Sequence, residues 1–488
     1  MLNISKTLYC ECKDCPKIFW LHNHKPELAA EDNDDKSRLS TGILVGEIAR
    51  NYFGNYSLIP QNLDIANAVK ETKKLIKKKA PVIAEATFQY ECCLCKADIL
   101  LCHEDSVSLV EVKSSTGLKP EYIDDCAFQY NVLSSSGIKV EKVSLMFINN
   151  QYERNGELDL QQLFSIVDIT KEVKNKQDEV RKNIEALSKI ASFDLEPESI
   201  VGPHCGCVFM DYCFRDIPQP NIFSIAGMYS SKKWELFNKG IVTFKQLLES
   251  GYPLKDKEQL QVATEVNKSP PYIKKQEIKE FLSTLTYPVY FLDFETYQQA
   301  IPLFDNVRPY QQIPFQYSLH ILTQEGKLSH LEFLAKEGTD PRRQFAECLC
   351  NDIPRTACVI AYNSSFEKSI LSNISDLFPD ISNHLLTIRD NIIDIMLIFK
   401  SGAYYDRSME GSYSIKRVLP ALFPDDPELN YNNLTGIHNG NEAMTTFADL
   451  HNRITEEIAV IRKQLLDYCC LDTYAMVKIF KKLKEVIL

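Results

Sequence analysis

The stretch YPVYFLDFET, residues 287–296, decides the fold of the C-terminal part of the chain. Its apolar run, Val289 to Leu292, predicts a buried strand, and carboxylates follow at Asp293 and Glu295. Residues two apart lie on one face of a strand, so these carboxylates repel each other at the end of an apolar element and lose solvation. Alone, the pair is more typical of a solvated strand end than of a metal site. With further carboxylates nearby, it predicts a divalent-metal site.

Two later stretches supply those carboxylates. VIAYNSSFEKSIL, residues 359–371, predicts a short strand that leads into a helix carrying Glu367. LLDYCCLDTYAM, residues 465–476, predicts a helix on which Tyr468 and Asp472 share one face, because they stand four residues apart. The alternative for Tyr468 is a core tyrosine on the inner face of this last helix.

In combination these motifs resemble those of the DnaQ-like, or DEDD, 3′-to-5′ exonucleases. Asp293 and Glu295 match the first motif, Glu367 ends the second, and Tyr468 with Asp472 matches the third, in the DEDDy variant. The resemblance implies an RNase H-like fold and two Mg²⁺ or Mn²⁺ ions about 4 Å apart that hold the scissile phosphate. It also implies that the tyrosine orients the attacking water. The second motif normally ends in Asp, so the longer Glu367 departs from the pattern.

A second set of candidate residues lies in two predicted strands of the N-terminal part. Asp98 begins an apolar stretch, and Glu111 and Lys113 share a face of the next strand. An Asp followed by Glu-x-Lys resembles the RecB-like PD-(D/E)xK nucleases, in which the carboxylates bind metal and the lysine polarises the attacking water. That resemblance adds Glu47 on a preceding helix and Gln129 on a following one. An ion pair across one strand face is the alternative for Glu-x-Lys.

The chain has 16 cysteines, and in a reducing compartment clustered thiols predict metal binding rather than disulfides. Cys15 precedes the predicted nuclease core, and Cys205, Cys207 and Cys213 follow it. One early and three late cysteines resemble the iron–sulfur RecB-like nucleases of the AddB and CRISPR-adaptation types. The resemblance implies a four-iron four-sulfur cluster that joins the two ends of the domain.

The alternatives to this cluster are a zinc ion and no metal at all. Cys12 and Cys15, two residues between them, together with Cys205 and Cys207 could form a tetrahedral zinc site. Two further residues could replace one of these ligands: Cys10 and His204.

The length of 488 residues exceeds what one hydrophobic core serves, and the pattern along the chain predicts three domains. Residues 1–220 combine strand-like runs with cysteine clusters. Residues 221–285 form a helical connector, either a helix-hairpin-helix element or a plain helical hairpin, and residues 286–488 resume an α/β pattern. The predicted fold class is therefore α/β, a RecB-like nuclease domain joined by a small helical connector to an RNase H-like exonuclease domain.

The net charge of −11 indicates no general attraction to nucleic acid. A metal-dependent nuclease nevertheless concentrates carboxylates at its site and needs only local basic contacts. Apolar runs stay far shorter than the roughly 20 residues of a membrane helix, and the first residues lack the apolar core of a signal peptide. We therefore expect a cytoplasmic protein that has no membrane partner.

The order of the three parts resembles a bacterial family in which an iron–sulfur RecB-like nuclease is fused to a DnaQ-like exonuclease. The resemblance sets neither substrate nor pathway. We expect a Mg²⁺- or Mn²⁺-dependent hydrolase acting on DNA, on single strands or ends, with a helicase or another DNA-processing protein as candidate partner. Two alternatives stay open: RNA as the substrate, and a nucleic-acid-binding module whose RecB-like domain does not cut.

Overall fold

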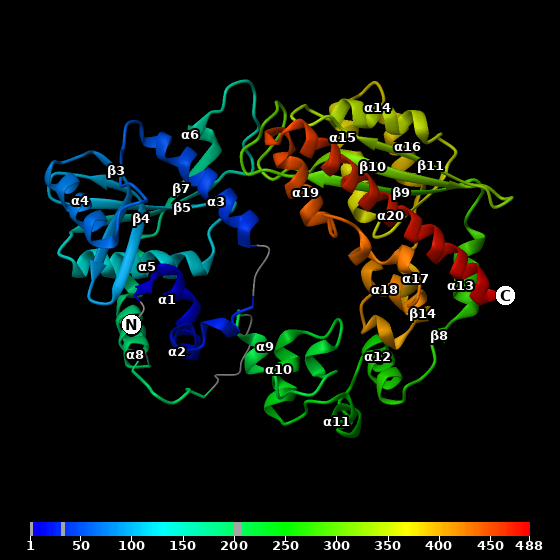
Figure 1. The fold of residues 1–488 in the computed structure, drawn as a ribbon, viewed down its shortest axis with the longest axis horizontal. Coiled ribbons are helices and arrows are strands. Elements are labelled where there is room, and N and C mark those ends of the chain that lie inside the picture. The colour runs from blue at the N-terminus through cyan, green and yellow to red at the C-terminus, as the bar shows by residue number, and fades with distance from the viewer. Residues whose placement is uncertain (1–2, 31–34, 191, 199–206) are drawn as a thin grey trace. The chain divides into compact units, whose positions relative to one another are not determined.

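The computed structural model describes residues 3–30, 35–190, 192–198 and 207–488 (Figure 1). The chain forms two compact units, both of mixed α/β structure. Unit 1 is Met1–Asp216 with Gln299–Gln311, and unit 2 is Ile217–Gln298 with Gln312–Leu488. The predicted connector, residues 221–285, is therefore grouped with the C-terminal unit. None of the helices in the described ranges is long and apolar enough to cross a membrane.

Unit 1 is built on a seven-stranded sheet. Its strands are β1 (Ile4–Ser5), β2 (Ser57–Leu58), β3 (Val82–Tyr90), β4 (Cys93–Cys102), β5 (Val107–Lys113), β6 (Val140–Ile148) and β7 (Phe164–Asp168). Its helices are α1 (Lys6–Cys12), α2 (Pro16–His24), α3 (Asp35–Arg50), α4 (Ile65–Lys77), α5 (Pro120–Ser135), α6 (Leu160–Leu163), α7 (Thr170–Asn175), α8 (Gln177–Ile190) and α9 (Met210–Cys213).

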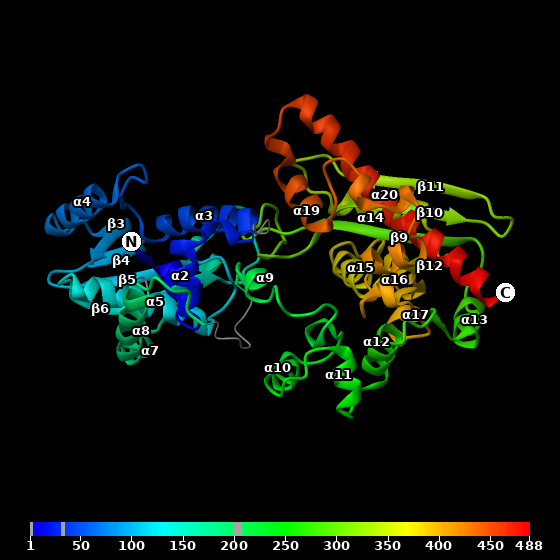
Figure 2. The same ribbon diagram turned by 60° about the horizontal axis from the view of Figure 1, so that its bottom comes forward.

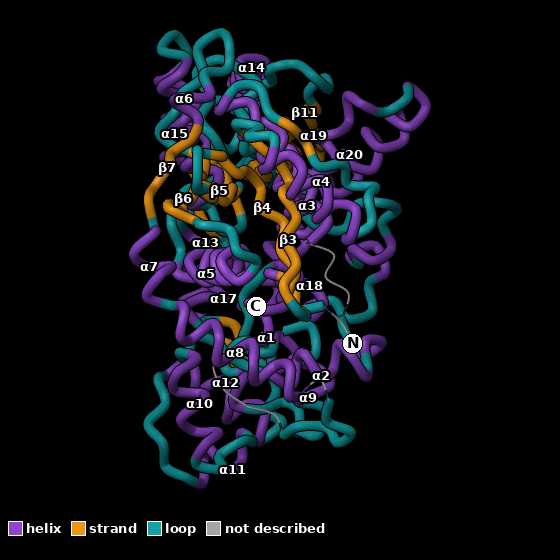
Figure 3. The backbone as a smooth tube through the Cα atoms, turned by 90° about the vertical axis from the view of Figure 1, so that its left-hand side faces the viewer, coloured by secondary structure: helices purple, strands orange, loops and turns teal. Residues whose placement is uncertain are grey.

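The strands of this sheet follow the order β2-β3-β4-β5-β6-β7, and β1 pairs with β4. Figure 3 shows β3 to β7 side by side. Alternation along β5 and β6 divides the apolar side chains between two core clusters. One cluster joins Leu109 and Val143 to residues of α1, α2, α5 and α8, and the other joins Val110 and Met146 to residues of α3. Helices therefore cover both faces, and strands β4 and β5 bring the predicted N-terminal site into the middle of the sheet.

Residues 299–311, which lie between two strands of unit 2, complete the second of these clusters. Ala300 and Ile301 are buried in it, and Tyr310 packs against it. The Tyr310 hydroxyl donates to the Ser114 carbonyl, and Arg154 donates to the carbonyl of Pro302 over 2.8 Å. The sequence pattern assigned this segment to the third domain. The burial of Ala300 and Ile301 and the backbone hydrogen bonds of Arg154 with the segment place it in unit 1 instead.

Unit 2 carries a five-stranded sheet and a two-stranded one. Its strands are β8 (Tyr272–Ile273), β9 (Val289–Tyr297), β10 (Ile313–Leu322), β11 (Leu328–Leu334), β12 (Cys358–Ala361), β13 (Ile392–Asp394) and β14 (Tyr404–Tyr405). Its helices are α10 (Ser230–Asn238), α11 (Phe244–Glu249), α12 (Asp256–Val266), α13 (Lys275–Ser283), α14 (Arg342–Asp352), α15 (Ser365–Leu377), α16 (Ser382–Asn391), α17 (Met396–Ser401), α18 (Ile415–Leu422), α19 (Gly440–Asp449) and α20 (Thr455–Ile487).

The larger sheet has the order β11-β10-β9-β12-β13, so β9 is its central strand. Strands β9, β10 and β11 are antiparallel, whereas β12 and β13 run parallel to β9. Helix α20 lies on one side of the sheet, and α15 and α16 lie on the other (Figure 2). The central strand thus presents one face to α20, and that face carries Asp293 and Glu295.

Candidate active sites

Three acidic side chains of unit 2 converge between β9 and α20. Asp293 and Glu295 come from the central strand, and Asp472 comes from the helix that covers it. One carboxylate oxygen of each lies within 4.8 Å of the others. Glu295 and Asp472 are each 8% exposed, and Asp293 is half-buried. The structure therefore brings three of the four predicted carboxylate ligands into one group.

Burial and mutual repulsion raise the pKa values of this group. Burial, followed by the charges of Asp472 and Glu295, raises the pKa of Asp293 well above its usual range. Burial and the charge of Asp472 also raise the pKa of Glu295 to about 8, although the charge of Lys416 opposes the shift. Removing these protons at neutral pH requires a positive charge at the site.

Glu367, the fourth predicted ligand, lies just outside this group. It stands in the first turn of α15 and is 2% exposed, and its Oε2 has no hydrogen-bond partner among the described residues. Its charge adds to the raised pKa values of Asp293 and Glu295. A buried carboxylate oxygen without a partner is costly, so this oxygen is one that a cation would satisfy.

The turn that places Glu367 is held by Asp394 at the end of β13. Its carboxylate accepts hydrogen bonds from the backbone N–H groups of Asn363 (3.0 Å), Ser364 (3.2 Å) and Met396 (3.0 Å). Asn363 has a φ of 67°, a left-handed conformation that asparagine tolerates better than most residues. Asp394 therefore positions the start of α15 rather than joining the carboxylate group.

Two tyrosines meet Asp472, and the sequence predicts only one of them. Tyr468 stands one helical turn before Asp472 and is buried. Tyr431, in a short 3₁₀ helix (Tyr431–Asn433), donates a hydrogen bond of 2.5 Å to Asp472 Oδ1. Burial raises the pKa of Asp472 to about 6, although these two hydroxyls and the charge of Lys416 lower it. Burial also raises the pKa of Tyr468, so its hydroxyl stays protonated and acts as a donor.

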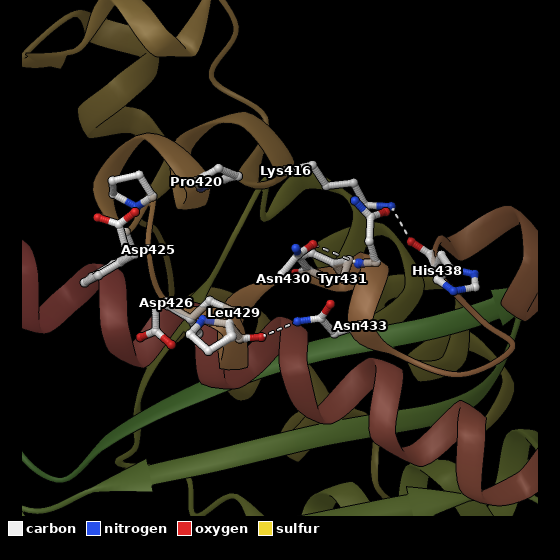
Figure 4. A pocket seen from close by; sticks show the side chains of 13 residues that line it. Lys416, Pro420, Asp425, Asp426, Leu429, Asn430, Tyr431, Asn433 and His438 are labelled. Atoms are coloured by element: carbon white, nitrogen blue, oxygen red, sulfur yellow. Dashed lines mark hydrogen bonds between the residues drawn. The ribbon is translucent and has the colours of Figure 1, made fainter.

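A pocket of about 570 Å³ opens beside Tyr431, the residue that donates to Asp472 (Figure 4). Lys416 and Tyr431 line it, and both act on the carboxylates through charge or hydrogen bonding. The Lys416 ammonium donates to the His438 carbonyl over 3.0 Å and lies over the rings of Tyr431 and Tyr468 at 5.5 and 5.9 Å. The site thus combines a cationic side chain, an open pocket and a carboxylate group whose oxygen donors fit a hard divalent cation such as Mg²⁺ or Mn²⁺.

One family model matches the chain, over residues 290–414, and its description is a domain of unknown function (DUF2779). The matched range contains Asp293, Glu295 and Glu367 and ends before Asp472. No curated protein and no solved structure matches the chain.

The predicted N-terminal site also comes together in unit 1, around Glu111. Gln129 donates to Glu111 Oε2 over 2.6 Å, and Lys113 lies 3.0 Å from Oε1. Lys6, which the sequence did not suggest, lies 2.5 Å from the same oxygen. Burial alone would raise the pKa of Glu111, but the charges of Lys6 and Lys113 lower it to about 2. This carboxylate is therefore ionised and already neutralised by lysine.

Asp98 lies opposite Glu111 when the β4–β5 register is continued by one residue. Its Oδ2 accepts a hydrogen bond of 2.8 Å from the backbone N–H of Val112. Burial and the charge of Glu111 raise the pKa of Asp98 to about 7, while the charge of Lys6 lowers it. Among the described residues, Asp98 and Glu111 do not belong to a group of three metal-binding side chains within 4.8 Å.

A third acidic residue, Glu85 of β3, lies in line with Asp98 and Glu111 across the three neighbouring strands. The sequence predicts Glu47 for this position. The β3–β4 register places Glu85 across from Asp98, and its charge raises the pKa of Asp98. Glu85 has a φ of 59° and pairs with Arg50 of α3 over 2.7 Å. Glu47 is exposed on α3, and none of the described contacts brings it to Glu111. Glu85 could be found only from the pairing register of β3 with β4, which the amino-acid sequence does not give.

Three of the four cysteines predicted to hold the iron–sulfur cluster lie in the described part of the chain, and all three pack against the same hydrophobic core of unit 1. Cys15, Cys207 and Cys213 are half-buried and pack on the cluster of α1, α2, α5 and α8. Burial raises the pKa of the Cys12 thiol, and the charges of Glu11, Cys15 and Cys207 add to this, so both thiols lie within electrostatic range of Cys12.

The other proposed ligands divide into two groups. Cys205 and His204 lie outside the described residues. The Cys10 thiol is bound elsewhere, because it donates to Asp125 Oδ1 over 3.0 Å.

Proposed function

We propose that unit 2 is a metal-dependent nuclease that removes nucleotides from the 3′ ends of DNA. The observation that carries this proposal is the group formed by the half-buried Asp293 and the buried Glu295 and Asp472, three carboxylates within 4.8 Å of one another. Such a group is costly without a cation, and the unpartnered oxygen of Glu367 adds a fourth ligand. Bound Mg²⁺ or Mn²⁺ supplies Lewis-acid stabilisation of phosphoryl charge and lowers the pKa of bound water.

The surrounding side chains have distinct tasks in this proposal. The Tyr468 hydroxyl stays protonated and orients water beside Asp472. The Lys416 ammonium faces the pocket and binds a substrate phosphate electrostatically. The pocket, at about 570 Å³, falls in the size range of small-molecule sites and receives the terminal nucleotide.

End-labelled substrates test this proposal directly. Purified protein is incubated with single-stranded and duplex DNA and RNA, labelled at either end, with Mg²⁺ or Mn²⁺. We expect stepwise shortening from the 3′ end that Asp293→Ala and Asp472→Asn abolish. Asp467→Asn is the matched control, because Asp467 is exposed on the same helix. Retained shortening in Asp293→Ala, with the control normal, rejects the proposal, and preference for RNA selects the alternative substrate.

For unit 1 we propose two candidate functions, a RecB-like nuclease and a nucleic-acid-binding module that does not cut. The position of Lys6 distinguishes between them. A RecB-like nuclease needs Asp98 and Glu111 free for metal, with Lys113 acting on the attacking water. Lys6, 2.5 Å from Glu111, instead supplies the positive charge from the protein itself. That contact favours a nucleic-acid-binding module that does not cut. Loss of a cutting activity in Lys113→Ala, with 3′ shortening retained, would favour the nuclease.

We also propose that Cys15, Cys205, Cys207 and Cys213 hold a four-iron four-sulfur cluster. The proximity of Cys12, Cys15 and Cys207 supports a thiolate site, and Cys12 is a further candidate ligand. Among the described residues, Cys12, Cys15, Cys207 and Cys213 do not supply a group of three sulfurs within 4.8 Å, whereas tetrahedral zinc needs sulfur atoms about 3.8 Å apart. Iron and sulfide content of anaerobically prepared protein tests the cluster, and stoichiometric zinc without iron selects the zinc alternative.

A further inference from the structure

A second cluster of metal-binding side chains lies in unit 2, at the β10–β11 edge of the larger sheet. His320 of β10 and His330 of β11 are directly opposite in the antiparallel register, and their ring centres are 4.4 Å apart. One nitrogen of each ring and the Cys470 sulfur of α20 lie within 4.8 Å of one another. Figure 2 shows α20 lying along these strands. This cluster shares no residue with the carboxylate group of β9.

Two hydroxyl groups hold the imidazoles in place. Thr473 Oγ1 lies 2.8 Å from His320 Nδ1, and Ser318 Oγ lies 2.9 Å from His330 Nε2. The two hydroxyl oxygens are 2.6 Å apart, and Thr473 donates to the Cys470 carbonyl over 3.1 Å. These four bonds need four hydrogens, of which the hydroxyls supply only two. The remaining two must come from His320 Nδ1 and His330 Nε2.

This assignment leaves the opposite ring nitrogens with lone pairs. A neutral imidazole carries a single ring proton. Nε2 of His320 and Nδ1 of His330 are then unprotonated. A histidine whose second nitrogen donates to a fixed oxygen is typical of metal sites, because that bond sets both tautomer and ring orientation.

A fourth donor stands beside these three. Glu332 follows His330 by two residues on β11, and its Oε2 lies 3.9 Å from His330 Nδ1, the nitrogen with the lone pair. Among the described residues the group within 4.8 Å comprises His320, His330 and Cys470, and Glu332 stands at its margin, beside His330. Two imidazoles, a thiolate and a carboxylate are the ligand types of four-coordinate zinc sites.

We propose that His320, His330, Glu332 and Cys470, which we call the edge site, bind one Zn²⁺ ion. Thiolate and imidazole select zinc over Mg²⁺, which prefers oxygen donors. On binding, the Cys470 thiol loses its proton to solvent as the zinc–sulfur bond forms. Four protein ligands leave no open position, so the role is structural: the ion fastens α20 to the sheet edge. Cys470 and Thr473 flank Asp472, so the edge site also fixes the helix that carries that carboxylate.

The test measures metal binding to the full-length chain without nucleic acid, so its result does not depend on nuclease activity. Chelator-treated protein is dialysed against limiting Zn²⁺, and zinc per chain is counted for wild type, Cys470→Ser and His330→Ala. We expect each variant to hold one zinc ion fewer than wild type. Cys348→Ser, on α14 and also half-buried, is the matched control and should match wild type.

Cobalt substitution gives an independent readout, because a cysteine-bound Co²⁺ ion has a thiolate charge-transfer band. The band from unit 2 should disappear in Cys470→Ser, and Glu332→Gln, an exposed and mild change, should weaken Zn²⁺ binding about tenfold. Circular dichroism checks that every variant is folded. Equal zinc content in wild type and folded Cys470→Ser, or equal cobalt spectra, would overturn the proposal.

Discussion

Replacing Glu295 by Gln should stabilise the protein when no metal is bound. The side chain is 8% exposed, and burial with the charge of Asp472 raises its pKa from 4.5 to about 8. The folded state therefore binds more protons than the unfolded state between these values, and the free energy of unfolding falls as pH rises through them. Gln keeps the shape of the side chain but has no charge to bury.

The size of the effect follows from that pKa difference. At about 1.4 kcal/mol for each tenfold change in proton affinity, the ceiling is about 5 kcal/mol above pH 8. The charge of Lys416 offsets part of the repulsion, and Asp472 shares it, so we expect about 1–3 kcal/mol. For a unit of this size that corresponds to a rise of roughly 3–8 °C in the melting temperature.

Thermal unfolding of the full-length protein in a chelator, from pH 5 to pH 8, measures this difference. The gain of Glu295→Gln over wild type should be small at pH 5 and largest at pH 8, and Mg²⁺ should stabilise wild type more than the variant. Glu457→Gln, an exposed position at the start of α20, is the control and should change neither quantity. A variant no more stable than wild type at pH 8, or equally stabilised by Mg²⁺, would refute the view that these carboxylates await a cation.

Three further predictions concern residues around the two sites. Tyr431→Phe removes the hydrogen bond to Asp472 and raises its pKa, so Mg²⁺ titration should show about tenfold weaker binding at pH 6 and a smaller deficit at pH 8. Asp394→Asn weakens the turn before α15, so we expect a loss of about 1–2 kcal/mol in calorimetry and reduced 3′ shortening. Lys6→Ala leaves Glu111 with one lysine fewer, so unit 1 should lose about 1–3 kcal/mol without metal and gain stabilisation by Mg²⁺, measured as melting with and without the ion.

Much of the carboxylate group could be predicted, because the residues of each motif lie close together in the sequence and within one strand or one helix. Asp293 and Glu295 fall in a strand that spans Val289–Tyr297, and Tyr468 and Asp472 fall in a helix that spans Thr455–Ile487. Strand alternation and the helical repeat then dictate which side chains share a face. The expectation that these elements meet came from the resemblance, and the structure shows that Asp293 and Asp472 do lie within 4.8 Å.

The remaining residues could not be predicted, because their neighbours come from distant parts of the chain. Tyr431 sits in a short 3₁₀ helix without periodic signal, 41 residues before the carboxylate it contacts. Lys6 reaches Glu111 from 105 residues away. His320 and His330 face each other only in one strand register, which is not set by either histidine.

The segment of residues 299–311 ties the folding of unit 1 to a late stage of protein synthesis. Ala300 and Ile301 fill one of its two core clusters, but ribosomes produce them only after the whole of residues 217–298. Unit 1 can therefore begin to fold early but closes its second face only when strand β9 of unit 2 has already been made. A fragment beginning at residue 286 would carry these apolar side chains without their partners. Neither unit can be inherited or exchanged as an uninterrupted length of polypeptide.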